Sequence, residues 1–210
     1  MNKIEIFEKY TAKYEDWFER NPWVYQSELK AIKQKLPEIG KGVEIGVGTG
    51  RFAKPLGIRI GIEPSKNMGV IARSNGIEVV NAKAEKLPFV DSKFDFVLMV
   101  TTVCFLDDIQ AAFKEAFRAT KAKGRIFIGF VDKDTNLGKA YQECKNNNVF
   151  YKFAKFYSVE QIVFYLKKAG YVKFEFSQTI FKDLSEINEE EVATEGYGDG
   201  SFVVISAFKQ

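Results

Sequence analysis

The most informative absence in this 210-residue sequence is histidine, which does not occur at all. Histidine is the usual side chain for proton transfer near neutral pH and a common metal ligand. Its absence excludes hydrolases built on Ser-His-Asp or Cys-His groups, and enzymes whose metal is bound by histidine. The chemistry must therefore use carboxylates, lysines, tyrosines, backbone groups or a cofactor, and we expect no metal site.

Cysteine is scarce as well. Cys104 and Cys144 are the only two, and they do not form a C-x-x-C pair. Two separate thiols argue against a zinc site or a disulfide framework. They favour a reducing compartment, so we expect a cytoplasmic protein.

Long apolar runs and clusters of one charge are also missing. No window approaches 18 uninterrupted apolar residues, and charges interrupt the first segment, so we expect no membrane span and no signal peptide. The formal net charge is only +3, without a run of basic residues. We therefore expect no nucleic-acid partner. The pattern leaves the oligomeric state open.

What the sequence does contain is the composition of one folded domain. Apolar residues make up 46% and charged residues 28%, the balance of a globular protein. The length suffices for one sizeable core. We predict a single domain over 1–210 with four parts: a helical cap (1–38), a core (40–130), an insertion (131–157), and a C-terminal helix with strands (158–210).

Strands and helices alternate through the core segment. The predicted strands are 43–47, 59–62, 78–81, 94–100 and 125–130, and the predicted helices are 51–56, 65–74 and 109–120. This alternation is typical of βαβ units and a doubly wound α/β fold. A capping-box pattern at Ser158 and Gln161 opens a helix that ends at Gly170, and strands 172–180 and 202–208 follow.

A glycine-rich turn follows the first predicted strand. Residues 43–50 read Val-Glu-Ile-Gly-Val-Gly-Thr-Gly, so Gly46, Gly48 and Gly50 alternate. Glycine permits tight turns and lets a ligand lie against the main chain. A sharp turn without a ligand is the alternative interpretation.

Two carboxylates sharpen the ligand interpretation. Glu63 ends the second predicted strand, where a carboxylate can accept both ribose hydroxyls of a nucleoside, although it could also be a solvated charge. A dinucleotide turn needs a glycine where Arg51 stands, which disfavours a nicotinamide cofactor. S-adenosylmethionine has no phosphate, and Glu44 is placed for its ammonium group. Alternatively, or in addition, backbone N–H groups hold Glu44 as a buried carboxylate.

These residues resemble a known family. Positions 43–50 are similar to the first motif of class I S-adenosylmethionine-dependent methyltransferases, and Gly61–Ser65 with Met68 resembles the second. Residues 84–89 resemble the adenine-side stretch of the ubiquinone-biosynthesis-like (type 11) subgroup, and 108–124 the helix and turn before strand five. The resemblance implies a Rossmann-like sheet of seven strands, mostly parallel with an antiparallel last strand.

The resemblance also implies that S-adenosylmethionine lies along the carboxyl edge of the strands. From its methionine end to its adenine, the implied contacts are Glu44, Gly46, Gly48 and Gly50 (methionine), Val100 and Thr101 (sulfonium), Glu63 (ribose), and Pro64, Met68, Ala84 and Glu85 (adenine). Lys83 departs from the subgroup, which usually has an aspartate facing the adenine amino group. Lysine cannot accept a hydrogen bond.

The methyl acceptor must be inferred from what caps the sheet. A sulfonium is already activated, so transfer needs alignment more than covalent help, and the sequence shows no catalytic residue. The N-terminal helices and residues 132–157 are rich in aromatic residues, and we expect them to close over the methyl group. Tyr14 and Trp17 are the predicted acceptor contacts. Ordinary core packing of these rings is the alternative.

The predicted function is methyl transfer from S-adenosylmethionine to a small-molecule acceptor, an amine or an aromatic compound. Aromatic faces suit a flat or cationic acceptor. A non-catalytic module that senses S-adenosylmethionine or its demethylated product would carry the same binding motifs and is the alternative. A nicotinamide-dependent oxidoreductase is the third hypothesis for the function, which Arg51 disfavours.

Overall fold

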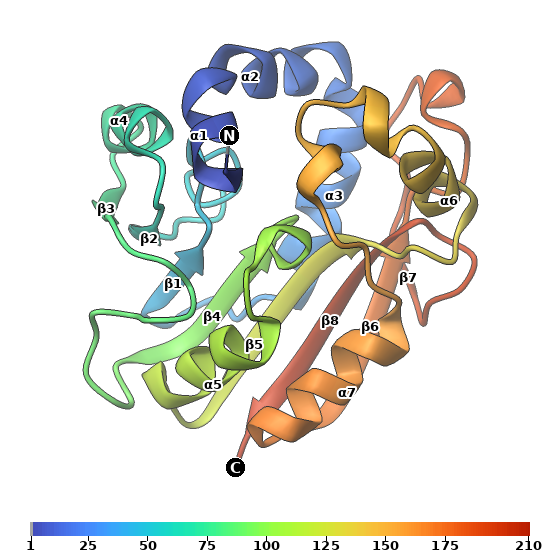
Figure 1. Cartoon of the computed structure of the whole chain (residues 1–210). Coiled ribbons are helices and arrows are strands. Elements are labelled where there is room, and N and C mark those ends of the chain that lie inside the picture. Colours follow the sequence, from blue (N-terminus) through green and yellow to red (C-terminus); the bar gives the residue numbers. More distant parts are fainter. Residues whose placement is uncertain (1) are drawn as a thin grey trace.

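The structure, a computed structural model, describes residues 2–210 and is built on one eight-stranded sheet (Figure 1). Residue 1 of the predicted cap lies outside the described residues. The strands are β1 (Gly42–Ile45), β2 (Ile60–Ile62), β3 (Glu78–Val80), β4 (Phe94–Val100), β5 (Thr120–Val131), β6 (Tyr171–Thr179), β7 (Thr194–Glu195) and β8 (Phe202–Lys209). The α-helices are α1 (Lys3–Lys9), α2 (Thr11–Arg20), α3 (Pro22–Lys35), α4 (Lys66–Ser74), α5 (Ile109–Ala119), α6 (Asn136–Glu143) and α7 (Val159–Ala169).

The strand order is β3-β2-β1-β4-β5-β8-β6-β7. The first five strands in this order run parallel, and β8 pairs antiparallel with both β5 and β6. The predicted doubly wound sheet, mostly parallel with an antiparallel last strand, is confirmed. The eighth strand is the two-residue β7, which pairs with the edge of β6 and comes from an acidic loop without strand patterning.

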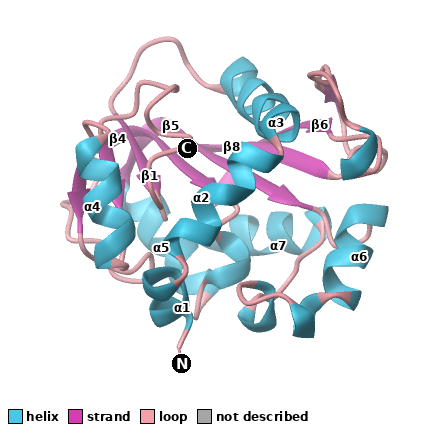
Figure 2. Ribbon diagram, turned by 90° about the horizontal axis from the view of Figure 1, so that it is seen from above, coloured by secondary structure: helices cyan, strands magenta, loops and turns pink. Residues whose placement is uncertain are grey.

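Helices cover both faces of this sheet (Figure 2). On one face, α5 and α7 pack with the sheet into a core that includes Phe113 and Leu166, both without exposed surface. On the other, α3 and α4 contribute Ile32 and Ala72 to a second core. Because each fully buried large apolar side chain is worth about 1.5–3 kcal/mol, these two layers fix the sheet that carries the site.

Local signals set the ends of the helices. Asp108 caps α5 by accepting hydrogen bonds from the N–H groups of Gln110 and Ala111 at 2.9 and 3.0 Å. The predicted capping box of α7 is present between Ser158 and Gln161. The same helix ends at Gly170, whose φ of +109° lies in the left-handed region that glycine tolerates.

Two helical predictions need correction. Residues 51–56 form a series of turns rather than a helix, because Pro55 lacks the N–H that would continue it and the chain turns at Gly57, with φ +72°. The helical cap predicted over 1–38 is interrupted at Tyr10, which separates α1 from α2. There the Thr11 hydroxyl donates to the carbonyl of Phe7 at 2.6 Å and so competes with the backbone ladder.

Helices α1 and α2 of the cap lie over the carboxyl ends of the parallel strands, and α6 with the following short turns lies beside them (Figure 1). The two regions touch where the rings of Phe7 and Phe150 stack with centroids 5.2 Å apart. Among residues 2–210, no helix is long and apolar enough to cross a membrane.

Candidate active site

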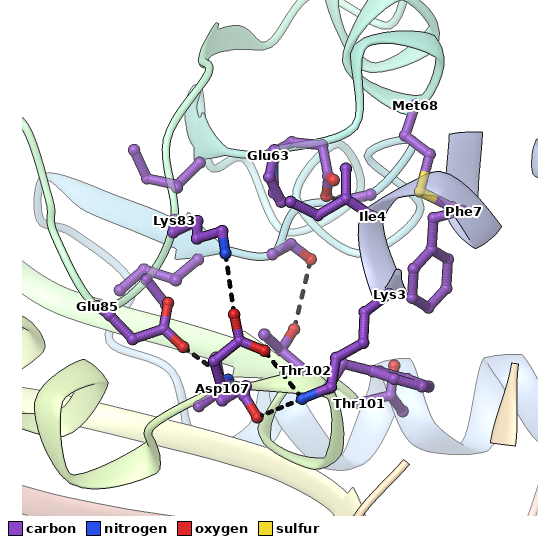
Figure 3. A pocket seen from close by; sticks show the side chains of 18 of the residues that line it. Lys3, Ile4, Phe7, Glu63, Met68, Lys83, Glu85, Thr101, Thr102 and Asp107 are labelled. Carbon is purple, nitrogen blue, oxygen red and sulfur yellow. Dashed lines mark hydrogen bonds and ion pairs between the residues drawn. The ribbon is translucent and has the colours of Figure 1, made fainter. Parts of the chain in front are cut away.

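A cavity enclosing about 130 Å³ opens at the carboxyl ends of β1, β2 and β4 (Figure 3). We call it the edge cavity. Nine of the eleven residues predicted to contact the cofactor line it: Gly46, Gly48, Glu63, Pro64, Met68, Ala84, Glu85, Val100 and Thr101. Glu44 and Gly50 do not. The topology therefore gathers residues from the end of β4 and from the segments that follow β1, β2, β3 and β4 at one edge of the sheet.

Glu63 follows β2 and is held by two backbone donors. Its Oε2 accepts from the N–H of Gly48 at 2.9 Å, and its Oε1 accepts from the N–H of Ser65 at 2.8 Å. Burial raises the pKa of Glu63 to about 7, against the opposing effect of these two N–H groups. Each carboxylate oxygen has further lone pairs, so the group can accept more hydrogen bonds from a ligand in the cavity.

The glycine turn brings bare backbone to the cavity wall. A Cβ at Gly46 would lie 2.4 Å from the Thr102 hydroxyl, and one at Gly48 would lie 3.1 Å from the Tyr14 hydroxyl. Both glycines have positive φ, +73° and +56°. The turn therefore needs glycine for its conformation and for close packing.

Gly50 serves a different purpose from the other two glycines. Its Cβ would lie 2.3 Å from Ile77, so its contacts are with the packing near α4 and not with the cavity. Its φ of +88° also requires glycine. The sequence pattern alone did not separate this structural glycine from the two at the wall.

Glu44 lies within β1 and is 2% exposed. It accepts a hydrogen bond from the N–H of Ala53, which matches the alternative interpretation of a buried carboxylate held by backbone. Its Oε2 has no hydrogen-bond partner. Burial raises the pKa of Glu44 well above the ordinary value, and the charge of Glu63 adds to the rise. A buried carboxylate in this condition gains from any nearby cation.

A cluster of charged residues, Lys3, Lys83, Glu85 and Asp107, lines another part of the edge cavity. Lys83 donates to Asp107 at 2.9 Å, and Lys3 of α1 reaches the same carboxylate at 3.1 Å (Figure 3). Glu85 accepts from the N–H groups of Asp107 and Asp108. Asp107 thus pairs its carboxylate with Lys83 at the wall of the cavity. None of the sequence motifs predicted Asp107 as a site residue.

The cap is tied to the glycine turn by ion pairs. Arg51, which stands where a dinucleotide turn needs glycine, binds Glu15 at 2.7 Å and Glu19 at 2.8 Å, both on α2. Glu15 also accepts from the hydroxyl of Thr49. Arg51, which argues against a nicotinamide cofactor, therefore links helix α2 of the cap to the glycine turn.

A second cavity of about 260 Å³ lies under the cap, and we call it the aromatic cavity. It is lined by rings from α2, from α6 and from the segment after it, among them Trp17, Tyr141, Tyr151 and Phe156. The predicted acceptor contacts Tyr14 and Trp17 both line it. Thus the cap and the insertion do meet around a shared space.

The two cavities adjoin. Phe7, Tyr14, Thr101 and Phe105 line both of them. Burial raises the pKa of Tyr14 above its ordinary value, so its hydroxyl stays protonated near neutral pH. Thr101 has φ +49°, a left-handed conformation that is uncommon for a β-branched residue. Such strain is typical of functional sites.

Sequence reasoning missed several residues of these cavities. Asp107 and Lys3 come together only through the tertiary structure, and no local motif marks them. Glu28 had a signal: it stands four residues after Val24 and four before Ile32, on the buried face of α3. A carboxylate on an apolar helical face is a candidate functional residue. Within residues 2–210, no cluster of acidic or thiol side chains could hold a metal ion.

A family model described as a methyltransferase domain matches residues 43–128. An uncharacterized protein of Methanocaldococcus jannaschii is 46% identical over 206 residues, covering 98% of this chain and 100% of that protein. The crystal structure of an S-adenosylmethionine-dependent methyltransferase from Thermotoga maritima is 50% identical, with a TM-score of 0.96, and the match covers 98% and 99% of the two chains.

The chain belongs to the class I S-adenosylmethionine-dependent methyltransferases, of the type 11 kind. The predicted family, the enzyme class and S-adenosylmethionine as cofactor are thereby confirmed. Phosphoethanolamine N-methyltransferase 2 from Haemonchus contortus, solved with S-adenosyl-L-methionine, is 17% identical with a TM-score of 0.63, and the match covers 87% of this methyltransferase and 52% of that chain. At that identity the likeness shows the fold alone.

The residues of the edge cavity fit the cofactor. The wall offers bare backbone at Gly46 and Gly48, a carboxylate at Glu63 with free lone pairs, and a largely apolar lining. Glu44, whose Oε2 has no hydrogen-bond partner, lies in β1 directly before the same turn. Backbone, carboxylate and apolar surface are the groups that an amino acid, a ribose and an adenine need, respectively.

Proposed function

We propose that this methyltransferase transfers a methyl group to a small-molecule acceptor, an amine or an aromatic compound, held in the aromatic cavity. The observation that carries the proposal is the contact between the two cavities through Phe7, Tyr14, Thr101 and Phe105. An acceptor in the aromatic cavity can therefore lie next to the edge cavity, where these side chains line both.

Bound S-adenosylmethionine supplies an electrophilic methyl group. In the proposed arrangement, Glu63 accepts from the ribose hydroxyls, and Pro64 and Met68 pack against the adenine. Ala84 and Glu85 border the adenine edge.

The methionine end is proposed to lie on the backbone of Gly46 and Gly48, with Glu44 beneath the turn. Val100 ends β4 and Thr101 follows it, and both would face the sulfonium.

The residues between the cavities position the acceptor. Alignment of two reactants can supply about 7–11 kcal/mol of a barrier. Tyr14 contributes a protonated hydroxyl and a ring at this position, and Trp17 contributes a ring that lines only the aromatic cavity. The proposal needs no general base among these residues, consistent with a chain that contains no histidine.

The relative from Thermotoga maritima supports the amine branch of the proposal. It is described as a possible histamine N-methyltransferase. The rings of the aromatic cavity suit a flat or cationic molecule, since a cation over an aromatic face gains about 0.5–2 kcal/mol. We also propose a cytoplasmic location, because Cys104 and Cys144 are free thiols.

A methyl-transfer screen tests this proposal. Small amines, phenols, thiols and quinone precursors are incubated with S-adenosylmethionine, and formation of S-adenosylhomocysteine is followed. We expect turnover with members of the amine or aromatic groups. Intact cofactor binding without turnover across the screen would contradict the proposal.

A further inference from the structure

Glu28 is a carboxylate at the wall of the aromatic cavity. It lies in the middle of α3, on the face that packs toward the sheet, and is 5% exposed. It does not line the edge cavity. Its surface therefore faces the space assigned to the acceptor and not the cofactor.

No residue of the described chain, 2–210, gives Glu28 a hydrogen bond or an ion pair. Other buried carboxylates here have partners: Glu63 accepts from two backbone N–H groups, and Asp132 accepts from the N–H of Asp134 at 3.0 Å. Burying a carboxyl group without a partner is costly, because the water it loses is not replaced. A polar group left in this state calls for a ligand.

The surroundings of Glu28 are aromatic. Tyr141 and Tyr151 lie with ring centroids 4.6 Å apart, and Phe156 lies 5.5 Å from Tyr151. Lys13 is the other charged residue at this wall, and it is exposed on α2. A carboxylate among aromatic faces is the combination that recognises an organic cation, because both carboxylate and ring attract positive charge.

Among the residues that line the aromatic cavity, Glu28 is the acid whose pKa lies close to neutral pH. Burial raises its pKa to about 8. Burial likewise raises the pKa of Tyr141 to about 12, that of the Cys104 thiol to about 12, and that of Tyr151 well above its ordinary value, so these groups stay protonated. The remaining lining tyrosines, Tyr14 and Tyr157, and the neighbouring Tyr25 on α3 also have pKa values raised by burial.

We infer that Glu28 binds a cationic group of the methyl acceptor, at a point separate from the atom that receives the methyl group. This inference rests on the proposed function. The separation follows from the cavities, because the acceptor atom must lie near Tyr14 and Thr101 whereas Glu28 lines the aromatic cavity alone. The acceptor class is a small organic cation with an apolar body and a second, nucleophilic group.

Calorimetric titration of the S-adenosylhomocysteine-bound protein tests this inference without turnover. The probes are two matched pairs, phenethylamine with 2-phenylethanol and butylamine with butanol. The variants are Glu28→Gln and, as a matched control, Glu38→Gln, which removes an exposed carboxylate outside the cavity. We expect at least one amine to bind about tenfold or more tightly than its alcohol in the wild type and in the control.

In Glu28→Gln we expect the preference for the amine to disappear while binding of S-adenosylhomocysteine is unchanged. Titrations at pH 7.5 in two buffers of different ionisation enthalpy add a second readout. A cation that binds Glu28 lowers its pKa, so the wild type should release a fraction of a proton and Glu28→Gln none. Equal affinity within each pair, or no amine binding at millimolar concentration, overturns the inference.

The experiment separates this inference from the proposed function. If the amines bind through Glu28 but no acceptor in the screen is methylated, the inference stands and the proposed function fails. If an amine is methylated with the same kcat/KM in wild type and Glu28→Gln, the function stands and the inference fails. Thermal unfolding of both variants checks that each is folded.

Discussion

The two cavities of this methyltransferase are built in different ways. The edge cavity takes its key groups from backbone and from single residues at strand ends, such as Gly46, Gly48 and Glu63. The aromatic cavity is made of side chains from segments far apart in the chain, from Phe7 to Leu184. A site made by local backbone can be read from a local motif, whereas a site made by distant side chains depends on how the fold brings them together.

The largest expected effect falls on the edge cavity. Glu63→Ala removes a carboxylate proposed to accept two ribose hydroxyls and also frees the N–H groups of Gly48 and Ser65. Hydrogen bonds to charged groups are worth about 1.5–3 kcal/mol each, so S-adenosylmethionine affinity should fall about 100-fold. Calorimetry measures it, with Glu78→Gln on the exposed edge strand as the control. An unchanged dissociation constant would remove Glu63 from the cofactor site.

The second effect is on the stability of the protein, through the buried carboxyl group of Glu28 in the aromatic cavity. The folded pKa of Glu28, about 8, is raised above its ordinary value of 4.5. A raised pKa favours the protonated form in the folded state, so the free energy of unfolding should fall as pH rises from about 4.5 through 8. In Glu28→Gln the fall should be smaller by a few kcal/mol, since each pKa unit is worth about 1.4 kcal/mol. Chemical denaturation across this pH range measures the difference, and parallel curves would contradict it.

The third effect separates the two cavities. Trp17→Ala removes a ring that lines only the aromatic cavity. We expect the KM for the acceptor to rise about tenfold, from lost contact worth about 1.4 kcal/mol, with cofactor affinity unchanged. Tyr14→Phe, at the boundary, should lower kcat instead. If neither variant changes turnover or acceptor affinity, the cap does not form the acceptor site.

The sequence predicted the two cavities unequally. It predicted the sheet, its parallel core and nine of the residues that line the edge cavity, because the glycine turn and the strand ends are local features that carry the family resemblance. It did not predict Glu28, Tyr141 or Tyr151 as a group, since their meeting requires α3 and α6 to be placed by the sheet. The failed helix at 51–56 is a different case, because its cause, the missing N–H of Pro55 and the turn at Gly57, is local.

A fourth prediction uses pH to examine the edge cavity. If ribose hydroxyls donate to Glu63, the ionised carboxylate is the form that binds, and its pKa in the free protein is about 7. Cofactor affinity should therefore be constant above pH 7 and fall by up to about tenfold per unit below it. Titration of S-adenosylhomocysteine binding measures the profile, and Glu63→Gln should flatten it. A profile that stays flat in the wild type would argue against an ionised Glu63.

The smallest effect is expected at the boundary between the cavities. Thr101→Gly should relieve the strain of φ +49° and raise the free energy of unfolding by about 1 kcal/mol. It should also lower turnover a few-fold, because the freed backbone holds the boundary less firmly. Lys123→Gly is the control: it has φ +62° in an exposed part of β5, so stability should rise without loss of activity. Equal activity in the two variants would show that the strain has no functional part.

The position of β8 has a consequence for how the chain is made. This strand lies between β5 and β6, although it follows both in the sequence. Until Phe202–Lys209 emerge from the ribosome, the nascent chain therefore holds two strands with open edges, and open edges invite pairing with other chains. The cofactor edge can form early during synthesis, but closure of the sheet has to wait for the residues that fill this gap.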